Sequence, residues 1–161
     1  MRIGVVSDTH GKPDFFREAV RQMGAVDLLI HAGDHFSDAV SMSRETGIEV
    51  VAVTGNCDWH ATGPAEEELD IMGYKILVTH GHRYGVKIDN TKLVQKLREG
   101  KYDLIIYGHS HCPEITHLPD GCLLNPGSVS APRRGSSHSY AIVTIDKKGI
   151  SPYIYELKRQ L

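Results

Sequence analysis

Short apolar runs alternate with helical stretches through the first third of the chain. The runs are rich in Ile, Leu and Val, which is typical of buried strands, and they are residues 2–7, 27–31 and 48–53. Residues 13–23 carry apolar side chains at helical spacing and begin with Pro13, a residue favoured at the first helical position. A second helix is predicted over residues 36–46, ending at Gly47. This strand–helix alternation predicts a parallel sheet with crossover helices.

The rest of the chain predicts hairpins, one more helix and one more buried strand. Gly73 divides one hairpin, and Pro119-Asp120-Gly121 forms a turn because Pro fixes φ and Gly permits positive φ. A helix is predicted over residues 89–99. The predicted strands are residues 67–72, 74–79, 103–107, 115–118, 122–124, 139–146 and 150–157. With no internal repeat or linker, the sequence predicts a single α/β domain over residues 1–161, with two sheets and helices outside both.

Composition is ordinary for a globular protein, with 40% hydrophobic and 24% charged residues among 161. No apolar run approaches the ~20 residues that span a bilayer. The four-residue apolar stretch near the N-terminus is shorter than the ~7–15-residue core of a signal peptide. The three cysteines form no C-x-x-C pair, so a disulfide scaffold is not expected. These features predict a cytoplasmic protein without a membrane partner, in which Cys112 and Cys122 are small core residues.

Charge and histidine content narrow the classes of function. Eighteen Lys and Arg against 20 Asp and Glu give a formal net charge of −2. Nucleic-acid-binding domains are usually strongly basic, so no nucleic-acid partner is expected and a nuclease is disfavoured. Ten histidines are the unusual count, because histidine is the commonest metal ligand and titrates near neutral pH.

Five polar clusters occur where predicted strands end. They are Asp8-Thr9-His10, Gly33-Asp34, Gly55-Asn56-Cys57-Asp58, Thr79-His80-Gly81-His82 and Gly108-His109-Ser110-His111. Ligands at the carboxyl ends of strands in an α/β sheet converge on one crevice. The pairs Asp8/His10 and His109/His111 have period-2 spacing, which in extended backbone points both side chains the same way. In three clusters, the glycine before the polar residue is expected to allow a tight turn after the strand.

The candidate ligands are two carboxylates, four imidazoles and one amide: Asp8, His10, Asp34, Asn56, His80, His109 and His111. These are too many for one tetrahedral zinc ion, and no thiolate pattern accompanies them. Mixed nitrogen and oxygen donors suit two borderline divalent ions such as manganese, iron, zinc, nickel or cobalt, whereas calcium prefers oxygen ligands throughout.

In order and residue type, these clusters resemble the five motifs of the calcineurin-like metallophosphoesterase superfamily. The segment Asn125-Pro126-Gly127-Ser128 is similar to that of the small YfcE-type phosphodiesterases of bacteria and archaea. The resemblance implies a four-layer α/β/β/α sandwich with two mixed β-sheets and a dinuclear site, with manganese as the first candidate metal. It implies that one ion is held by Asp8, His10, Asp34 and His111, and a second by Asp34, Asn56, His80 and His109, with Asp34 bridging.

The resemblance and the ligand chemistry together predict hydrolysis of a small phosphodiester by direct attack of a metal-bridging hydroxide on phosphorus, without a phosphoenzyme. Two ions about 3.5–4 Å apart can clamp the attacking and leaving oxygens and lower the pKa of a bound water. Two divalent ions, two carboxylates and one hydroxide leave a net charge of roughly +1, which attracts an anionic phosphate.

Three further residues are candidates for catalytic roles. Many members of the superfamily carry His after the Gly-Asn pair, where it is thought to protonate the leaving group, but here the position is Cys57. A thiol is a poorer acid catalyst than an imidazolium at pH 7, so we expect a preference for good leaving groups such as activated aryl phosphodiesters. Asp58 either orients His80 or is a solvated turn residue. His82 lies two residues beyond His80 and is a candidate for substrate contact.

Other polar and aromatic residues have ordinary interpretations. The remaining histidines are expected at loop or surface positions, namely His31, His35, His60, His117 and His138. Trp59 either lines the crevice or packs against the fold, and Arg133-Arg134 either binds phosphate or is a solvated pair. The segment Asn125 to Ser128 is expected to be a turn that places backbone beside the site. Substrate choice is expected to lie in the loops 59–66, 82–88 and 129–138.

Two rival functions stay open from the sequence. One is a non-catalytic scaffold of the same fold that binds partner proteins, as a retromer subunit does, and the complete ligand set argues against it. The other is a phosphomonoesterase, since both ester types present similar oxygens to a metal pair. The sequence has no phosphate-binding P-loop, nucleophile elbow or H-E-x-x-H helix. A homodimer or higher homo-oligomer is expected from base rates.

Overall fold

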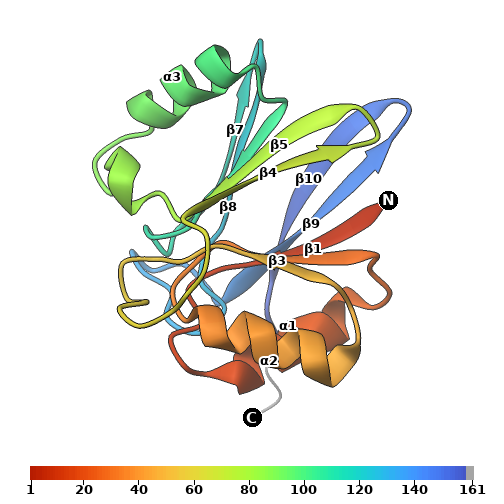
Figure 1. The fold of residues 1–161 in the computed structure, drawn as a ribbon, viewed down its shortest axis with the longest axis vertical. Coiled ribbons are helices and arrows are strands. Elements are labelled where there is room, and N and C mark those ends of the chain that lie inside the picture. The colour runs from red at the N-terminus through yellow and green to blue at the C-terminus, as the bar shows by residue number, and fades with distance from the viewer. Residues whose placement is uncertain (159–161) are drawn as a thin grey trace.

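Ten strands and three α-helices make up most of residues 1–158, the residues described by a computed structural model of the chain (Figure 1). The first half contains β1 (Arg2–Val6), α1 (Pro13–Met23), β2 (Leu28–His31), α2 (Phe36–Thr46) and β3 (Val50–Ala52). The second half contains β4 (Glu66–Ile71), β5 (Tyr74–Thr79), α3 (Thr91–Gly100), β6 (Leu104–Ile106), β7 (Pro113–Leu118), β8 (Gly121–Pro126), β9 (Ser139–Asp146) and β10 (Gly149–Glu156). All lie where the sequence predicts a helix or strand. A short 3₁₀ helix, η1 (His82–Tyr84), is not among the predicted elements.

The strands form two mixed five-stranded sheets. The first has the order β10-β9-β1-β2-β3, in which β1, β2 and β3 run parallel and β9 is antiparallel to β1. The second has the order β4-β5-β6-β8-β7, in which β5, β6 and β8 run parallel and the edge strands are antiparallel to their neighbours. The prediction of two mixed sheets is therefore confirmed.

The two sheets face each other across a dry interior. Val5 and Ile30 of the first sheet belong to the same fully buried cluster as Ile76 and Ile106 of the second. Burial of such side chains stabilises the fold by about 1.5–3 kcal/mol each. This shared interior holds the strand ends of the two sheets at a fixed separation.

Helices cover the outer face of each sheet, so the sandwich has four layers (Figure 1). Neighbouring residues on a strand point to opposite faces, which sends Val6 outward beside Val5. Val6 packs in one buried cluster with Phe16 of α1 and Met42 of α2. On the second sheet, the buried cluster under α3 contains Leu93, Leu97, Leu77 and Ile105. No helix within residues 1–158 is both long enough and apolar enough to cross a membrane.

Two segments differ from the sequence prediction. β3 is shorter than predicted, because the chain turns away after it and the Thr54 backbone N–H donates to the Pro64 carbonyl oxygen. Asn125 and Pro126 do not form a turn but are the last residues of β8. The turn begins only at Gly127, whose φ of 77° is in the left-handed region.

The polar clusters all lie just beyond strand ends. β1, β2 and β3 lead into residues 8–10, 33–34 and 55–58, while β5 and β6 lead into residues 80–82 and 108–111. Backbone contacts join neighbouring strand ends within each sheet, since the Gly108 N–H donates to the carbonyl oxygen of His80, and the Asp8 N–H to that of Gly33. The His109 N–H donates to Asp8 Oδ2 and so joins one sheet to the other. One end of the sandwich therefore receives polar groups from both sheets.

Candidate metal centre

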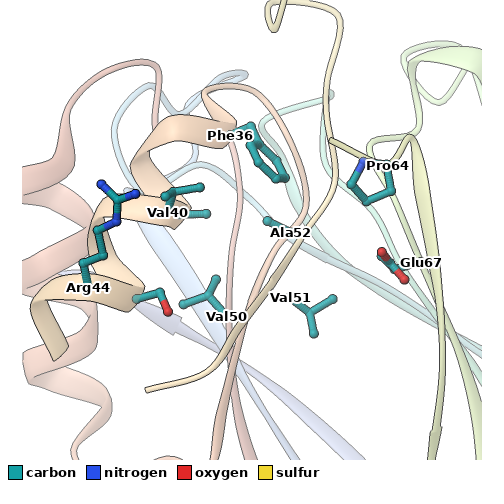
Figure 2. A pocket seen from close by; sticks show the side chains of 10 residues that line it. Phe36, Val40, Arg44, Val50, Val51, Ala52, Pro64 and Glu67 are labelled. Carbon is teal, nitrogen blue, oxygen red and sulfur yellow. The ribbon is translucent and has the colours of Figure 1, made fainter. Parts of the chain in front are cut away.

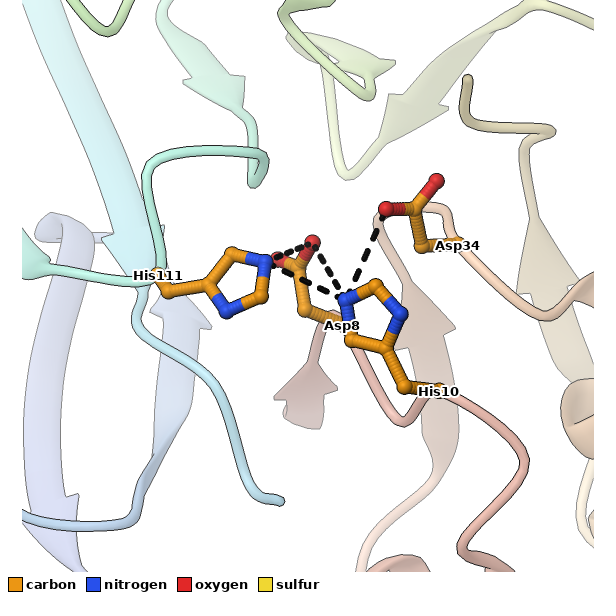
Figure 3. A group of neighbouring side chains, drawn as sticks. All are labelled: Asp8, His10, Asp34 and His111. Atoms are coloured by element: carbon orange, nitrogen blue, oxygen red, sulfur yellow. Dashed lines mark hydrogen bonds and ion pairs between the residues drawn. The ribbon is translucent and has the colours of Figure 1, made fainter. Parts of the chain in front are cut away.

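Four of the predicted ligands form a compact group at this end of the sandwich (Figure 3). One ligand atom from each of Asp8, His10, Asp34 and His111 lies within 4.8 Å of all the others. Asp8 Oδ1 is 3.2 Å from His111 Nε2 and 3.9 Å from His10 Nε2. Both carboxylates and His111 are buried, and the side chain of His10 is 24% exposed. The structure thus brings together residues that are up to 103 positions apart in sequence.

Asp34 directs its two oxygens to opposite sides. Its Oδ2 is 3.6 Å from His10 Nε2, whereas its Oδ1 is 3.3 Å from His80 Nε2. The Cys57 backbone N–H donates to Oδ1 at 2.9 Å and fixes the orientation of the carboxylate. A carboxylate placed in this way can contribute one oxygen to each of two neighbouring cations.

Two imidazoles are anchored so that Nε2 faces the cluster. His80 Nδ1–H donates to the Ala32 carbonyl oxygen at 2.7 Å, and His111 Nδ1–H donates to the Ala131 carbonyl oxygen at 2.6 Å. This arrangement leaves Nε2 of a neutral ring free to bind a cation. Among the described residues, Asp8 Oδ1 and His80 Nε2 are buried without any hydrogen-bond partner. Buried polar atoms are nearly always satisfied, so these two atoms fit a missing cation.

The ionisation of the cluster follows from these contacts. Burial raises the pKa of Asp8 and Asp34, but the nearby rings of His111 and His80 outweigh it, so both pKa values fall on balance. Burial lowers the pKa of His80, but Asp34 and Asp8 outweigh it and the pKa rises. Burial lowers the pKa of His10. The cluster therefore offers two ionised carboxylates, which is the donor chemistry that a divalent cation needs.

The other two predicted ligands are held more loosely. Asn56 is exposed, and within residues 1–158 its Nδ2 has one hydrogen-bond contact, to Cys57 Sγ at 3.6 Å. His109 is partly buried, and its ring centroid is 5.1 Å from that of His80. Burial, with the charge of His80 second, lowers the pKa of His109 to about 4, which keeps the ring neutral and able to bind a cation. His109 lies beside His80, and neither His109 nor Asn56 belongs to the compact group seen around Asp8.

The prediction that extended backbone points the side chains of Asp8/His10 and of His109/His111 the same way is wrong. Asp8, His10, His109 and His111 are not extended but have φ values of 55°, 48°, 69° and 60°. Left-handed backbone costs roughly 1–2 kcal/mol per non-glycine residue, so surrounding bonds must hold it. The side chains converge because the chain turns sharply after each strand, not because alternate residues of a strand share a face.

Two of the three glycines that precede polar residues allow neighbouring atoms to approach closely, and only one is needed for a positive φ. Gly33 has a φ of 95°, as a tight turn requires, but Gly55 and Gly108 do not have positive φ. A Cβ on Gly55 would lie 2.1 Å from Asp34 Oδ1, and one on Gly108 would lie 2.0 Å from Ser7 Oγ. Any larger residue at these two positions would displace the carboxylate side of the site.

Of the two roles left open for Asp58, orientation of His80 has no supporting contact among the described residues. Asp58 Oδ1 accepts from the Phe36 N–H and Oδ2 from the Gly55 N–H, each at 2.8 Å. The His80 ring is instead oriented by the Ala32 carbonyl oxygen. His80 Nδ1–H is thus bonded to a backbone carbonyl oxygen and not to a carboxylate, and the sequence carries no signal for such a backbone partner. Asp58 holds the turn that presents Asn56 and Cys57.

The other two catalytic candidates lie beside the cluster. Burial, followed by the charge of Asp34, raises the pKa of the Cys57 thiol to about 11, so it is a weak acid near neutral pH. The ring centroid of His82 is 5.4 Å from that of His80 and 6.0 Å from that of His109. His82 Nδ1 is also buried without a partner among the described residues, and burial lowers the His82 pKa. His82 therefore lies next to two of the predicted ligands, His80 and His109.

Several supporting residues were not identified from the sequence. The Ser128 and Ser130 hydroxyls both donate to the Asp8 carbonyl oxygen, at 2.8 and 3.0 Å. Asn125 Nδ2 donates to the Gly108 carbonyl oxygen at 3.1 Å. The Asn-Pro-Gly-Ser segment was a signal for part of this network, whereas Ser130 had none.

Three of the histidines that were expected at loop or surface positions make defined contacts in the structure. His31 is fully buried and contacts Thr9 Oγ1 through Nε2 at 3.1 Å, behind the segment that carries Asp8 and His10. His35 lies with its ring centroid 5.7 Å from that of His10. His138 Nδ1–H donates to the Val129 carbonyl oxygen. By contrast, Arg133 and Arg134 are exposed and form no ion pair among the described residues.

A separate hollow of about 480 Å³ lies at the edge of the first sheet (Figure 2). Figure 2 shows Val50 and Val51 of β3 at its floor, with Phe36, Arg44 and Glu67 around the rim. It contains no histidine and only one carboxylate, so it lacks the donors that a transition metal needs. This hollow is not part of the candidate metal centre.

Comparison with known proteins agrees with the geometry. A family model described as the calcineurin-like phosphoesterase superfamily domain matches residues 1–148. The chain is 34% identical over 158 residues to the probable metallophosphoesterase YsnB of Bacillus subtilis, covering 97% of this chain and 91% of that one. It is 31% identical over 171 residues to the phosphodiesterase YfcE of Escherichia coli, covering 91% and 89%.

A likeness in fold alone extends to a further protein. The structure of Vacuolar Protein Sorting 29 from Cryptosporidium parvum matches with a TM-score of 0.79 at 20% identity, covering 98% of this chain and 91% of that chain. At this level of identity the match concerns the four-layer architecture and not the chemistry of the site.

Proposed function

We propose that this chain, which belongs to the calcineurin-like phosphoesterase superfamily, is a metal-dependent phosphodiesterase that hydrolyses small phosphodiesters. The observation that carries the proposal is the position of Asp34, with one carboxylate oxygen toward His10 and the other toward His80. The buried, unpartnered atoms Asp8 Oδ1 and His80 Nε2 face the same space. Relatives named phosphodiesterase and metallophosphoesterase support the reaction class.

Two divalent ions would be held on the two sides of Asp34. One would take Asp8, His10, Asp34 and His111, and the other Asp34, Asn56, His80 and His109. Such ions supply Lewis acidity toward phosphate oxygens and lower the pKa of bound water. Manganese is the first candidate, with nickel, zinc, iron and cobalt as alternatives that share this preference for mixed donors.

The two candidate side-chain nucleophiles near the cluster, Cys57 and Ser110, are poorly suited to attack, which favours attack by water: the raised pKa of Cys57 keeps it a thiol near neutral pH. The Ser110 hydroxyl accepts from Asn125 Nδ2 of β8 at 2.9 Å and from the Cys112 N–H of its own loop at 3.3 Å, so both partners hold it in place. In the proposed reaction a water oxygen bonds to phosphorus as the bond to the leaving oxygen breaks. Direct displacement predicts inversion at an isotopically chiral phosphorus, and retention would require a covalent phosphoenzyme instead.

The leaving group receives little help from the protein. Cys57 is exposed at the rim of the cluster, and with a pKa of about 11 its thiol is a poor proton donor at pH 7. The proposal therefore includes a preference for esters whose leaving group departs without protonation, such as aryl phosphodiesters. His82 would contact the substrate, and Asp58 would position the turn that carries Asn56.

A purified, metal-free preparation supplied with single metals tests the proposal. Hydrolysis of bis(p-nitrophenyl) phosphate should appear with manganese and disappear with a chelator. It should exceed hydrolysis of p-nitrophenyl phosphate, since the reverse order would identify a phosphomonoesterase. The matched variants Asn56→Ala and His80→Ala should both lose activity. Metal-independent hydrolysis, or hydrolysis that survives both variants, would contradict the proposal.

The second candidate is a non-catalytic, partner-binding role, which rests on the likeness in fold to Vacuolar Protein Sorting 29. The two roles differ in what they require of the cluster. A scaffold needs the fold but not ionised Asp8 and Asp34, so complete absence of turnover with every metal, in a protein that still binds metal, would favour it.

A further inference from the structure

A hollow of about 320 Å³ lies directly beside the candidate metal centre. Its walls come from two segments: the start of α2, with His35, and the turn after β3, with Cys57, Trp59 and His60. Its volume is at the lower end of the range for small-molecule sites, about 300–1,000 Å³. No residue of this hollow other than Cys57 and Asp58 has a place in the proposed reaction.

Two residues that line the hollow adjoin the cluster on the side of Asp34. The His35 ring is 5.7 Å from the His10 ring, centroid to centroid. The Cys57 backbone N–H donates to Asp34 Oδ1 at 2.9 Å. A phosphate at the cluster would therefore carry one of its ester groups toward His35 and Cys57.

Trp59 gives this hollow an open aromatic face. It is the only tryptophan in the chain, and its side chain is 86% exposed. No aromatic ring within residues 1–158 stacks on it. A single exposed aromatic residue is unremarkable elsewhere on a surface, but here the indole is a wall of a hollow that adjoins a reactive cluster. An indole face gains free energy when a planar ring covers it.

The rest of the hollow favours a neutral, planar ligand. Both oxygens of Asp58 accept backbone N–H groups, so the one carboxylate in the wall already has a partner on each oxygen. The same two bonds fix the turn on which Trp59 stands. His35 and His60 add ring nitrogens that can donate to or accept from a heterocycle.

We infer that this hollow is the binding site for a planar aromatic ester group of the substrate, either a nucleobase or a phenyl ring, stacked on Trp59. The inference rests on the proposed function for its choice of substrate, since it assigns an ester group to a hollow beside the phosphate site. It goes further by naming the class of ester that the enzyme selects and the residue that selects it.

The single tryptophan makes binding directly measurable, without turnover. In zinc-loaded protein, AMP should quench Trp59 fluorescence saturably, whereas ribose 5-phosphate, which has the phosphate but no base, should not. Phenyl phosphate distinguishes the two sources of the ring: quenching equal to that by AMP indicates any aryl group, and weaker quenching indicates a nucleobase. Equal effects of AMP and ribose 5-phosphate, or no effect of AMP, would overturn the inference.

Variants supply the second arm of the test. Base stacking on an aromatic side chain corresponds to roughly five- to 150-fold in affinity. Trp59→Ala should therefore raise KM for bis(p-nitrophenyl) phosphate about tenfold with little change in kcat, and Trp59→Phe should restore most of the loss. Inhibition by inorganic phosphate should be unchanged in both variants.

Met72→Ala is the matched control. Met72 is also exposed, at 57%, but it lies in the turn between β4 and β5, at the opposite end of the strand that leads to His80. An unchanged KM in Trp59→Ala would overturn the inference while leaving the phosphodiesterase proposal intact. Absence of any metal-dependent turnover would instead contradict the proposed function. The fluorescence titrations would still show whether the hollow binds aromatic rings.

Discussion

The two sides of Asp34 are built differently. On the side of Oδ2, donor atoms of Asp8, His10, Asp34 and His111 already lie within 4.8 Å of one another, and three of the four residues are buried. On the side of Oδ1, only His80 is buried and anchored, while His109 is partly exposed and Asn56 is exposed. We call these the compact side and the open side.

The difference also extends to what supports each side. Behind the compact side, the Thr9 hydroxyl donates to Asp38 and contacts His31, while Ser128 and Ser130 hold the Asp8 carbonyl oxygen. Among the residues that the structure describes, no comparable set of side-chain bonds holds Asn56. Pre-organised ligands bind more tightly because less ordering entropy is lost on binding. The compact side should therefore keep its ion, and the open side should exchange its ion and meet the substrate.

The largest effect is expected where the two sides meet. Asp34→Ala removes one donor oxygen from each side at once, so kcat/KM for an aryl phosphodiester should fall by at least about 10³, equivalent to about 4 kcal/mol of transition-state stabilisation. Steady-state kinetics at saturating manganese measures this loss. The exposed Asp120→Ala is the matched control and should behave as wild type. A loss below tenfold would mean that Asp34 does not bridge the two sides.

A second prediction concerns the support behind the compact side at low pH. Burial lowers the pKa of His31 to about 4, below its ordinary value of about 6.5. Between these two pH values His31 is protonated in the unfolded chain but neutral in the folded chain. The unfolded state binds more protons between these values, and the contribution of His31 to stability is complete above pH ~6.5. It is lost as the pH falls toward 4, by up to about 3 kcal/mol.

Urea unfolding of metal-free protein between pH 4 and 7 measures this slope. His31→Gln keeps a polar side chain but cannot titrate, so its free energy of unfolding should vary less with pH than that of wild type. Parallel curves for the two proteins would show that His31 titrates normally and that the support of the compact side is insensitive to acid.

A third prediction separates the two sides by metal affinity. Calorimetric titration with manganese should show two binding events of unequal affinity. His111→Ala should weaken the tighter event by about 10- to 100-fold, the range found when a ligand's environment in a metal site is disturbed. His109→Ala should leave the tighter event unchanged and weaken the other. Two events of equal affinity would remove the distinction between a compact and an open side.

Some features of the fold and of the two sides could be predicted from the sequence, and others could not. The fold followed from apolar periodicity and glycine positions, because burial on two faces of each sheet leaves a strong pattern, as at Val5 and Val6. The grouping of Asp8, Asp34 and His80 followed from their positions at strand ends. The left-handed backbone at Asp8 and His109 did not, since nothing in local sequence distinguishes an extended pair from a sharp turn held by distant hydroxyls. The role of Asp58 was missed for a similar reason: its partners, Phe36 and Gly55, are backbone groups.

The smallest expected effect concerns Cys57, at the rim of the open side. Burial and the charge of Asp34 raise the pKa of this thiol to about 11, whereas an imidazole there could carry a transferable proton near pH 7. Cys57→His should therefore speed hydrolysis of phosphodiesters with poor leaving groups, by up to about tenfold, and leave p-nitrophenyl esters nearly unchanged. A plot of log kcat against leaving-group pKa should become shallower in the variant. Cys57→Ser, which is similar in size and no better as an acid, is the control and should keep the wild-type slope. An identical slope in all three proteins would show that the open side protonates its leaving group from some other source, and that the identity of residue 57 does not set substrate preference.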